Sequence, residues 1–322
     1  MNSKRLTESR AHQGMLLWAL IVGLSFPAVS LISEGLPPML LTAIRFLVAA
    51  VAIAPMVIRK ADFWPGAVGL ALYTVMGISL AVFFGTMFWA AHQTTPLTMS
   101  TLYVSVPVLA YFFGRVVGVE ERAGALLGIL AVGAAGALGL AWAGAGGHLD
   151  QLQFGMGEAA YFVGCMASAA YPVLSKLGLN RQWLSPAAEV RTFWSLIVGS
   201  ALVGLIGLTI ENPAQLWAMT LMDISIVAYL GLFSSGMTFW LTQRAAPVLT
   251  PGAVTAYSYL VPFVSMVLLF AQDVEHLGWQ WLPGSLLVVL AIALLFARDS
   301  GAAGRHVDRL SPHKFTFQES KS

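Results

Sequence analysis

One short stretch, Thr94 to Val108, is unusually polar for its surroundings. It reads TTPLTMSTLYVSVPV and lies inside a long apolar region. Thr101 and Ser105 recur at helical spacing, with Tyr103 and Pro107 on a neighbouring face. Hydroxyl groups need partners where water is absent, and a proline inside a helix removes one backbone hydrogen bond. These residues are therefore candidates for holding a polar solute. The alternative is that the hydroxyls bond their own helix and the proline only kinks it.

The same pattern returns in the second half of the chain, as LTPGAVTAYSYLVPF from Leu249 to Phe263. A shift of 155 residues aligns Thr95-Pro96 with Thr250-Pro251. The chain therefore contains two copies of one unit. Four prolines fall in matched places and are candidate hinges around a shared central cavity. They are Pro27, paired with Pro172, and Pro107, paired with Pro262.

Aromatic side chains with a polar tip can hold an apolar or aromatic solute and also form a hydrogen bond with it. Small hydroxyls beside them can bind an amino or carboxylate group. For each hydroxyl the alternative is contact between helices, and for each aromatic it is packing or the belt at the membrane surface. The candidate substrate-binding residues are Trp18, Tyr73, Trp89, Thr101, Tyr103, Ser105, Tyr161, Ser168, Trp240, Tyr257 and Tyr259.

Charged groups inside apolar segments are expensive and usually have a function. Glu158 and His92 are candidates for proton or ion coupling, although His92 also fits a solvated helix end. Arg45 and its repeat partner Arg191 are interpreted as structural charges. Two other roles are open for Arg45: its side chain could pair with a carboxylate of the substrate, or it could extend toward the lipid headgroups. For Arg191 the other interpretation is a position at the membrane–water interface. His12 is assigned to the N-terminal tail, and no cluster of residues predicts a metal site.

The elements that must position these residues are membrane-spanning helices. The chain is 58% hydrophobic and only 10% charged, whereas soluble domains are about 25% charged. A span needs about 20 apolar residues. The first run is interpreted as a span and not a cleaved signal peptide, because it has a counterpart in the second half. The ten candidate spans are 13–33, 37–58, 66–91, 96–119, 123–144, 154–178, 187–210, 221–243, 250–272 and 279–297.

The basic residues sort to one side of these spans. Fifteen of the seventeen Lys and Arg residues fall in the termini or in loops on that side, which predicts that both termini are cytoplasmic in a bacterial inner membrane. A unit of five spans is odd, so the second copy is inverted, as in many secondary transporters. The expected organisation is a cytoplasmic N-terminus (1–12), two five-helix repeats (13–144 and 154–297) and a cytoplasmic tail (298–322).

Several motifs, taken in order, resemble the EamA-type ten-helix transporters of the drug/metabolite transporter superfamily. They are TAIRF at Thr42–Phe46, PVLAYFF at Pro107–Phe113, EER at Glu120–Arg122 and PFVSMVLLF at Pro262–Phe270. The resemblance implies an all-α membrane fold with a substrate path between the halves. It also implies export of small metabolites, often amino acids, without ATP. The chain has no Walker motif, which agrees.

The prediction is therefore a secondary exporter of a small metabolite such as an amino acid, in contact with membrane lipid and not with nucleic acid, with a monomer or a homodimer as alternatives. An intramembrane enzyme is the first alternative, but HExxH and GxSxG motifs are absent from the sequence. A channel is the second, but no ring of charge is visible. No cofactor is expected. The glycine-rich span that begins at Gly124 and Gly128 is interpreted as close helix packing or as a dimer seam.

Overall fold

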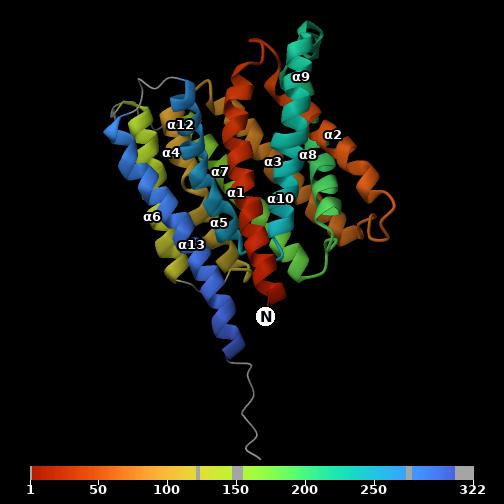
Figure 1. Ribbon diagram of the computed structural model, residues 1–322. Helices are drawn as coiled ribbons and strands as arrows, with labels where there is room; N and C mark the ends of the chain where they lie inside the picture. Colours follow the sequence, from red (N-terminus) through yellow and green to blue (C-terminus); the bar gives the residue numbers. More distant parts are fainter. Residues whose placement is uncertain (1, 121–123, 147–154, 273–277, 309–322) are drawn as a thin grey trace, which may run out of the picture.

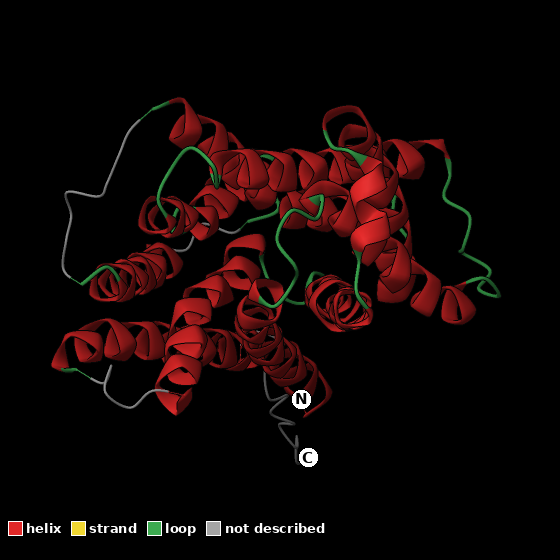
Figure 2. Cartoon of the chain, turned by 90° about the horizontal axis from the view of Figure 1, so that it is seen from above, coloured by secondary structure: helices red, strands yellow, loops and turns green. Residues whose placement is uncertain are grey.

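The computed structural model describes residues 2–120, 124–146, 155–272 and 278–308, and every regular element in these ranges is a helix (Figure 1). Seen from above, the chain is helix joined by short loops (Figure 2). Within the described ranges, ten helical segments are long and apolar enough to cross a membrane. The fold is therefore the predicted all-α membrane architecture.

The first half contains five spans, the fourth of which is interrupted. Its elements are α1 (Asn2–Ser30), α2 (Pro38–Val57), α3 (Ala67–Ala90), α4 (Pro96–Tyr103), α5 (Val106–Val116) and α6 (Gly124–Gly144).

The second half has the same order, with interruptions in its third and fourth spans. Its elements are α7 (Met156–Asn180), α8 (Ala188–Ile210), η1 (Pro213–Ala218), α9 (Leu221–Tyr229), η2 (Leu230–Met237), α10 (Thr238–Ala245), α11 (Pro251–Ala256), η3 (Tyr257–Tyr259), α12 (Leu260–Gln272), η5 (Trp279–Trp281) and α13 (Leu282–Asp308).

Two helices extend beyond their predicted spans, both at the ends of the chain. The first helix begins at Asn2 and not at residue 13, and the last continues to Asp308 instead of ending at 297. Polar residues ended the apolar runs in the sequence, but a helix continues past its apolar part wherever the backbone can still pair. The start of α1 and the end of α13 lie at the same end of the bundle (Figure 1).

The main contacts between helices are symmetric between the two halves: they recur when every helix is replaced by its counterpart in the other half. The pairs α2–α8, α6–α13 and α5–α11 join equivalent spans of the two units. The contact of α3 with α7 has its counterpart in α10 with α1, and that of α5 with α7 has its counterpart in α12 with α1. This pattern is consistent with the inverted repeat that the matched prolines predict.

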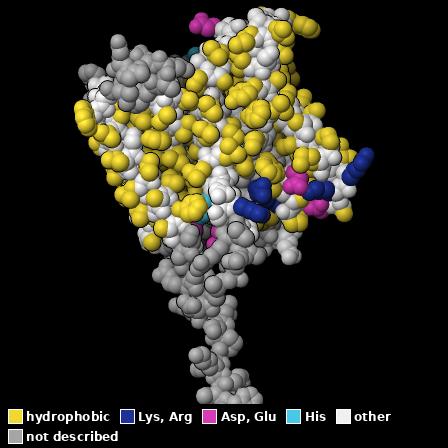
Figure 3. All heavy atoms as spheres, viewed as in Figure 1, with side chains coloured by type: hydrophobic (Ala, Val, Ile, Leu, Met, Phe, Trp, Pro, Cys, Tyr) yellow, Lys and Arg dark blue, Asp and Glu magenta, His cyan; other side chains and the backbone are white. Residues whose placement is uncertain are grey.

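The outer surface fits a lipid environment. Large apolar side chains are exposed along the sides of the bundle, among them Leu205, Ile210 and Leu286. On the face shown in Figure 3, apolar side chains form a broad band, and the visible charged side chains lie near its two ends. A water-soluble protein does not expose so much contiguous apolar surface.

Glycines let α6 and α13 approach closely. A Cβ added at Gly136 would lie 2.7 Å from the backbone nitrogen of Val288, so the two backbones are in contact there. In contrast, a Cβ added at Gly124 or Gly128 would meet nothing within 4 Å. The inner part of the glycine-rich helix is thus scaffold within one chain, and the dimer seam stays a prediction for its open part.

Candidate functional site

The fourth span of each half is broken near its middle. In the first half α4 ends at Tyr103 and α5 begins at Val106, and Pro107 is the second residue of α5. In the second half the 3₁₀ turn η3 separates α11 from α12, and Pro262 follows three residues after Tyr259. Proline cannot donate to the preceding turn, so the backbone regularity ends there. These breaks lie at the positions that the paired prolines predicted.

The same two spans also begin alike. Thr95 and Thr250 are their N-caps, and each threonine oxygen accepts from the backbone nitrogen three residues on, Thr98 and Ala253. A proline follows each cap, where a missing N–H costs nothing. The repeated Thr-Pro pair is therefore the start signal of a helix, and not part of the solute-binding surface.

The other two prolines do not interrupt their helices. Pro27 lies inside α1, close to its end and exposed, and Pro172 lies buried inside α7. Sequence reasoning missed a different irregularity, the π-helical segment η2 between Gly231 and Gly236. A Cβ at Gly231 would lie 3.0 Å from the carbonyl oxygen of Arg45, so η2 packs directly on α2. Wide helical turns are frequent at functional sites.

Three of the predicted substrate-binding residues, Tyr103, Tyr161 and Ser168, come together between α3, α4 and α7. The ring centroids of Phe83 and Tyr103 are 5.9 Å apart, and those of Phe83 and Tyr161 are 6.5 Å apart. Ser168 interacts with the Tyr103 hydroxyl, and Cys165 with that of Tyr161. Thr101, half-buried, lies on the same short helix as Tyr103. We call Phe83, Tyr103, Tyr161, Cys165 and Ser168 the aromatic cluster. It offers apolar faces with two phenol groups, suited to a small, partly apolar solute.

A second group of the predicted residues lies elsewhere. Tyr257 and Tyr259 belong to a core formed with α1, α6 and α13, and Trp18 packs against the same core. A Cβ added at Gly133 would lie 2.4 Å from the ring of Tyr259, so this tyrosine fills a helix–helix contact. Both side chains are buried. The structure therefore places the two groups in separate clusters, and packing explains Tyr259.

The remaining predicted residues are at helix ends or bond locally. Trp89 is 47% exposed near the end of α3, as an interfacial side chain would be. Trp240 on α10 carries the Arg244 guanidinium 5.1 Å from its ring centroid. The Ser105 hydroxyl donates to the carbonyl of Leu102 at 2.7 Å, so it caps the broken helix.

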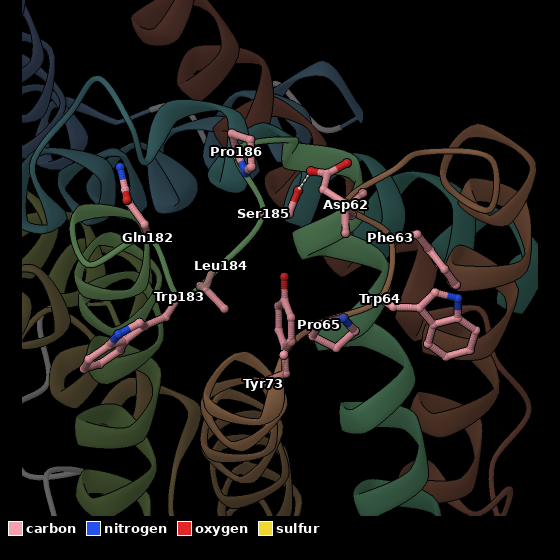
Figure 4. A pocket seen from close by; sticks show the side chains of 12 residues that line it. Asp62, Phe63, Trp64, Pro65, Tyr73, Gln182, Trp183, Leu184, Ser185 and Pro186 are labelled. Atoms are coloured by element: carbon pink, nitrogen blue, oxygen red, sulfur yellow. Dashed lines mark hydrogen bonds between the residues drawn. The ribbon is translucent and has the colours of Figure 1, made fainter.

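Tyr73 opens onto a pocket between the α2–α3 and α7–α8 loops, at the end of the bundle that holds the start of α1. The pocket has a volume of about 230 Å³. Figure 4 shows the Tyr73 hydroxyl pointing into this space from α3, with the Asp62–Ser185 hydrogen bond on the opposite wall. That hydroxyl has no hydrogen-bond partner among the described residues, although the side chain is only 1% exposed. The pocket is therefore a second place where a polar atom of a solute would find an unused donor.

Arg191 is the centre of a buried polar network and not an interfacial residue. Its Nε donates to Oε1 of Gln243 at 2.9 Å, and Ser175 donates to the same oxygen at 2.6 Å. Nε2 of Gln243 donates to the Tyr171 hydroxyl at 2.9 Å. The network joins α7, α8 and α10, which suits a structural charge. Sequence reasoning missed this pairing, because Gln243 is 52 residues away from Arg191 in the chain.

The other charged candidates have local partners. Nη2 of Arg45 donates to the Ser234 hydroxyl of η2 at 3.2 Å. Glu158 is buried at the start of α7, where its Oε2 accepts from the backbone nitrogen of Gly155 at 2.7 Å and caps the helix. His92 is exposed, and its Nδ1 lies 2.9 Å from the carbonyl oxygen of Phe88. None of these contacts tests a coupling role.

Comparison with known proteins fits this architecture. The model of the EamA-like transporter family matches residues 10–141 and again residues 155–297. The chain belongs to the EamA-like transporter family. It is therefore a membrane transporter, and each matched segment covers one of the two five-helix units.

Individual relatives are distant. The Escherichia coli K12 protein YedA, described as an uncharacterized inner membrane transporter, is 23% identical over 286 residues, which is 86% of this chain and 87% of that protein. YedA of Escherichia coli O157:H7 matches with the same values. One solved crystal structure superposes with a TM-score of 0.70 at 19% identity and covers 97% of this chain and 100% of its own. That likeness concerns the fold alone.

Proposed function

We propose that this EamA-family protein is a secondary transporter that exports a small metabolite by alternating access. The solute class is an amino acid with an apolar or aromatic side chain. Both termini face the cytoplasm of a bacterial inner membrane, because the basic residues gather on the side of the termini. The observation that carries the proposal is the aromatic cluster lying directly beside the broken span 4.

The chemistry of the cluster sets the solute class. Phe83, Tyr103 and Tyr161 form a largely apolar surface from three different helices. The two phenol groups and Ser168 supply hydrogen bonds but no charge, so the cluster favours a solute with a modest apolar body. Pro107 has no N–H to donate to the carbonyl group of Tyr103, four residues earlier, so in this proposal that carbonyl group accepts from the ammonium group of the solute.

The breaks in spans 4 and 9 supply the movement. Short helices joined by irregular turns can change their angle at a lower cost than one continuous helix. Because α5 packs on α11, a change at one break is transmitted to the other half. The two halves then move against each other around the solute, in contact with lipid on their outer faces.

Uptake into liposomes tests the proposal. Purified protein is reconstituted and offered a panel of labelled amino acids, with and without an imposed pH gradient. Saturable uptake of an apolar or aromatic amino acid is expected, and Tyr103→Ala is expected to lower its rate at least tenfold. Tyr229→Ala is the matched control, since Tyr229 is on α9 and stacks on Phe233.

Four outcomes decide the matter. Equal uptake by the Tyr103→Ala and Tyr229→Ala proteins would show that the solute does not bind at the aromatic cluster. Flux that never saturates would favour a channel. Recovery of a chemically altered solute would instead indicate an enzyme. Folded protein that takes up no amino acid would reject the solute class and leave the membrane-transporter family assignment in place.

A further inference from the structure

His12 is a buried residue in a position where sequence reasoning placed a tail. It lies on α1, and only 1% of it is exposed. The imidazole packs on the ring of Phe296, with 4.7 Å between centroids. A histidine kept from water needs partners for both of its ring nitrogens.

Each ring nitrogen faces a different segment of the second half. Nδ1 lies 2.6 Å from the hydroxyl of Tyr257, in the break of span 9. Nε2 lies 3.3 Å from Oδ2 of Asp299, on α13. A neutral ring that accepts from Tyr257 keeps its hydrogen on Nε2, toward the carboxylate. One imidazole thus connects α1 with η3 and α13, both of which pack on α1.

Charged side chains lie near this ring. Oδ1 of Asp299 lies 3.3 Å from Nε of Arg298. Glu8 is one helical turn before His12 on α1, and its Oε2 is buried without a hydrogen-bond partner among the described residues. Two carboxylates and one guanidinium give the group a charge of −1 when His12 is neutral. A proton on His12 makes the group neutral, and buried groups are least costly when their charges balance.

The neighbouring helices add no further charge through the contacts described. On η3 the titratable partner is Tyr257, and on α13 the partners are Arg298 and Asp299. On α10, which also packs on α1, the Arg244 side chain lies over Trp240. The described part of α12 beside α1 contributes apolar residues such as Val261 and Val264.

We propose that His12, Asp299 and Tyr257 form a proton-binding site that holds the termini-bearing end of α1 and α13 against the break in span 9. With the proton bound, His12 and Asp299 are an ion pair and the end is closed. When the proton leaves, the carboxylates of Asp299 and Glu8 leave an excess negative charge in a partly buried place, and this end opens. Under the proposed transport function, on which this step rests, the proton is released to the cytoplasm as that end opens to solute.

Hydrogen exchange tests the site without any solute. The full chain in nanodiscs is labelled between pH 5.5 and 8.5, with labelling times scaled for the intrinsic pH dependence of amide exchange. Amides of the 251–268 segment are expected to exchange about tenfold faster at pH 8.5 than at pH 5.5, because the proton-binding site governs local opening of this segment. Because no transport is measured, this result stands or fails separately from the proposed function.

Substitutions distinguish the effect of the proton-binding site from general effects of pH. His12→Gln keeps a hydrogen-bonding group but cannot titrate, and it is expected to remove the pH dependence in 251–268. His92→Gln, at an exposed histidine bonded to its own helix, is expected to keep it. Asp299→Asn removes the ion pair while His12 stays, so it is expected to weaken the dependence at least threefold. The proposal would be overturned if amide exchange in 251–268 of the wild-type chain did not depend on pH. It would also be overturned if that dependence were unchanged in both His12→Gln and Asp299→Asn.

Discussion

Arg191 and Gln243 form one hydrogen-bonded unit entirely inside the bundle. Beyond the side-chain contact, Nη2 of Arg191 donates to the main-chain carbonyl of Gln243 at 2.5 Å, and Nη1 donates to that of Ser185 at 2.6 Å. Arg191 and Gln243 are both 0% exposed. A single planar guanidinium therefore ties α8 to α10 and to the α7–α8 loop, which also forms one wall of the Tyr73 pocket.

Arg191→Lys is expected to lower the stability of the protein strongly. Lysine keeps the charge, but its ammonium group cannot reach three oxygens in a plane as the guanidinium does. Breaking a buried charged network costs about 3–5 kcal/mol. The measurement is equilibrium unfolding in detergent micelles, followed by intrinsic tryptophan fluorescence.

Arg181→Lys is the matched control, because Arg181 is exposed and only approaches the ring of Trp183 at 6.0 Å. Its substitution is expected to change stability by less than about 0.5 kcal/mol. Similar losses in the two variants would show that the fork geometry of Arg191 contributes nothing particular.

Glu211→Ala is expected to weaken the start of α2. Its two carboxylate oxygens accept from the backbone nitrogens of Met39 at 2.8 Å and Leu40 at 2.9 Å, so a residue at the end of α8 caps another helix. Losing such a cap costs about 1–2 kcal/mol. The measurement is thermal unfolding. The reference is Glu34→Ala, because Glu34 is an exposed acidic residue on the same side. A Glu211→Ala protein as stable as this reference would show that water replaces the cap.

The sequence predicted the features that repeat and that follow from local chemistry. Thr95-Pro96 and Thr250-Pro251 indicated the repeat, and Pro107 and Pro262 indicated two breaks. Apolar length gave ten spans, because each span must satisfy its backbone alone in lipid. Tyr103 and Tyr161 were predicted as solute contacts from their residue type, and this role stays a prediction.

Features made by distant contacts could not be predicted in the same way. His12 pairs with Tyr257, which is 245 residues away in the chain, so nothing near His12 indicates burial. Tyr257 and Tyr259 have the same polar tip as Tyr103, but their positions against α1 and α6 remove them from the aromatic cluster. The π-helical turn of η2 has no proline to signal it, because it depends on packing against α2.

Gly136→Ala is expected to destabilise the pair of helices α6 and α13. Its new methyl group would meet the backbone nitrogen of Val288 at 2.7 Å and the carbonyl oxygen of Gly284 at 2.9 Å, and neither can move without its helix. Overpacking of this kind costs about 1–3 kcal/mol. Gly128→Ala is the control on the same helix, where the methyl group meets nothing within 4 Å. Thermal unfolding should separate the two, and an unstable Gly128→Ala protein would place a contact, such as a second copy, on the open face.

Pro107→Ala is expected to slow transport without lowering stability. Alanine restores an N–H at position 107, which can donate to the carbonyl of Tyr103 and join α4 to α5 as one helix. A continuous span 4 bends less easily, so the maximal uptake rate should fall about fivefold to tenfold, while the melting temperature stays equal or rises. The measurement uses the amino acid that the liposome panel identifies. Pro213→Ala, in the exposed turn η1, is the control and should leave the rate unchanged. A Pro107→Ala protein that transports at the wild-type rate would mean that the break is not a moving part.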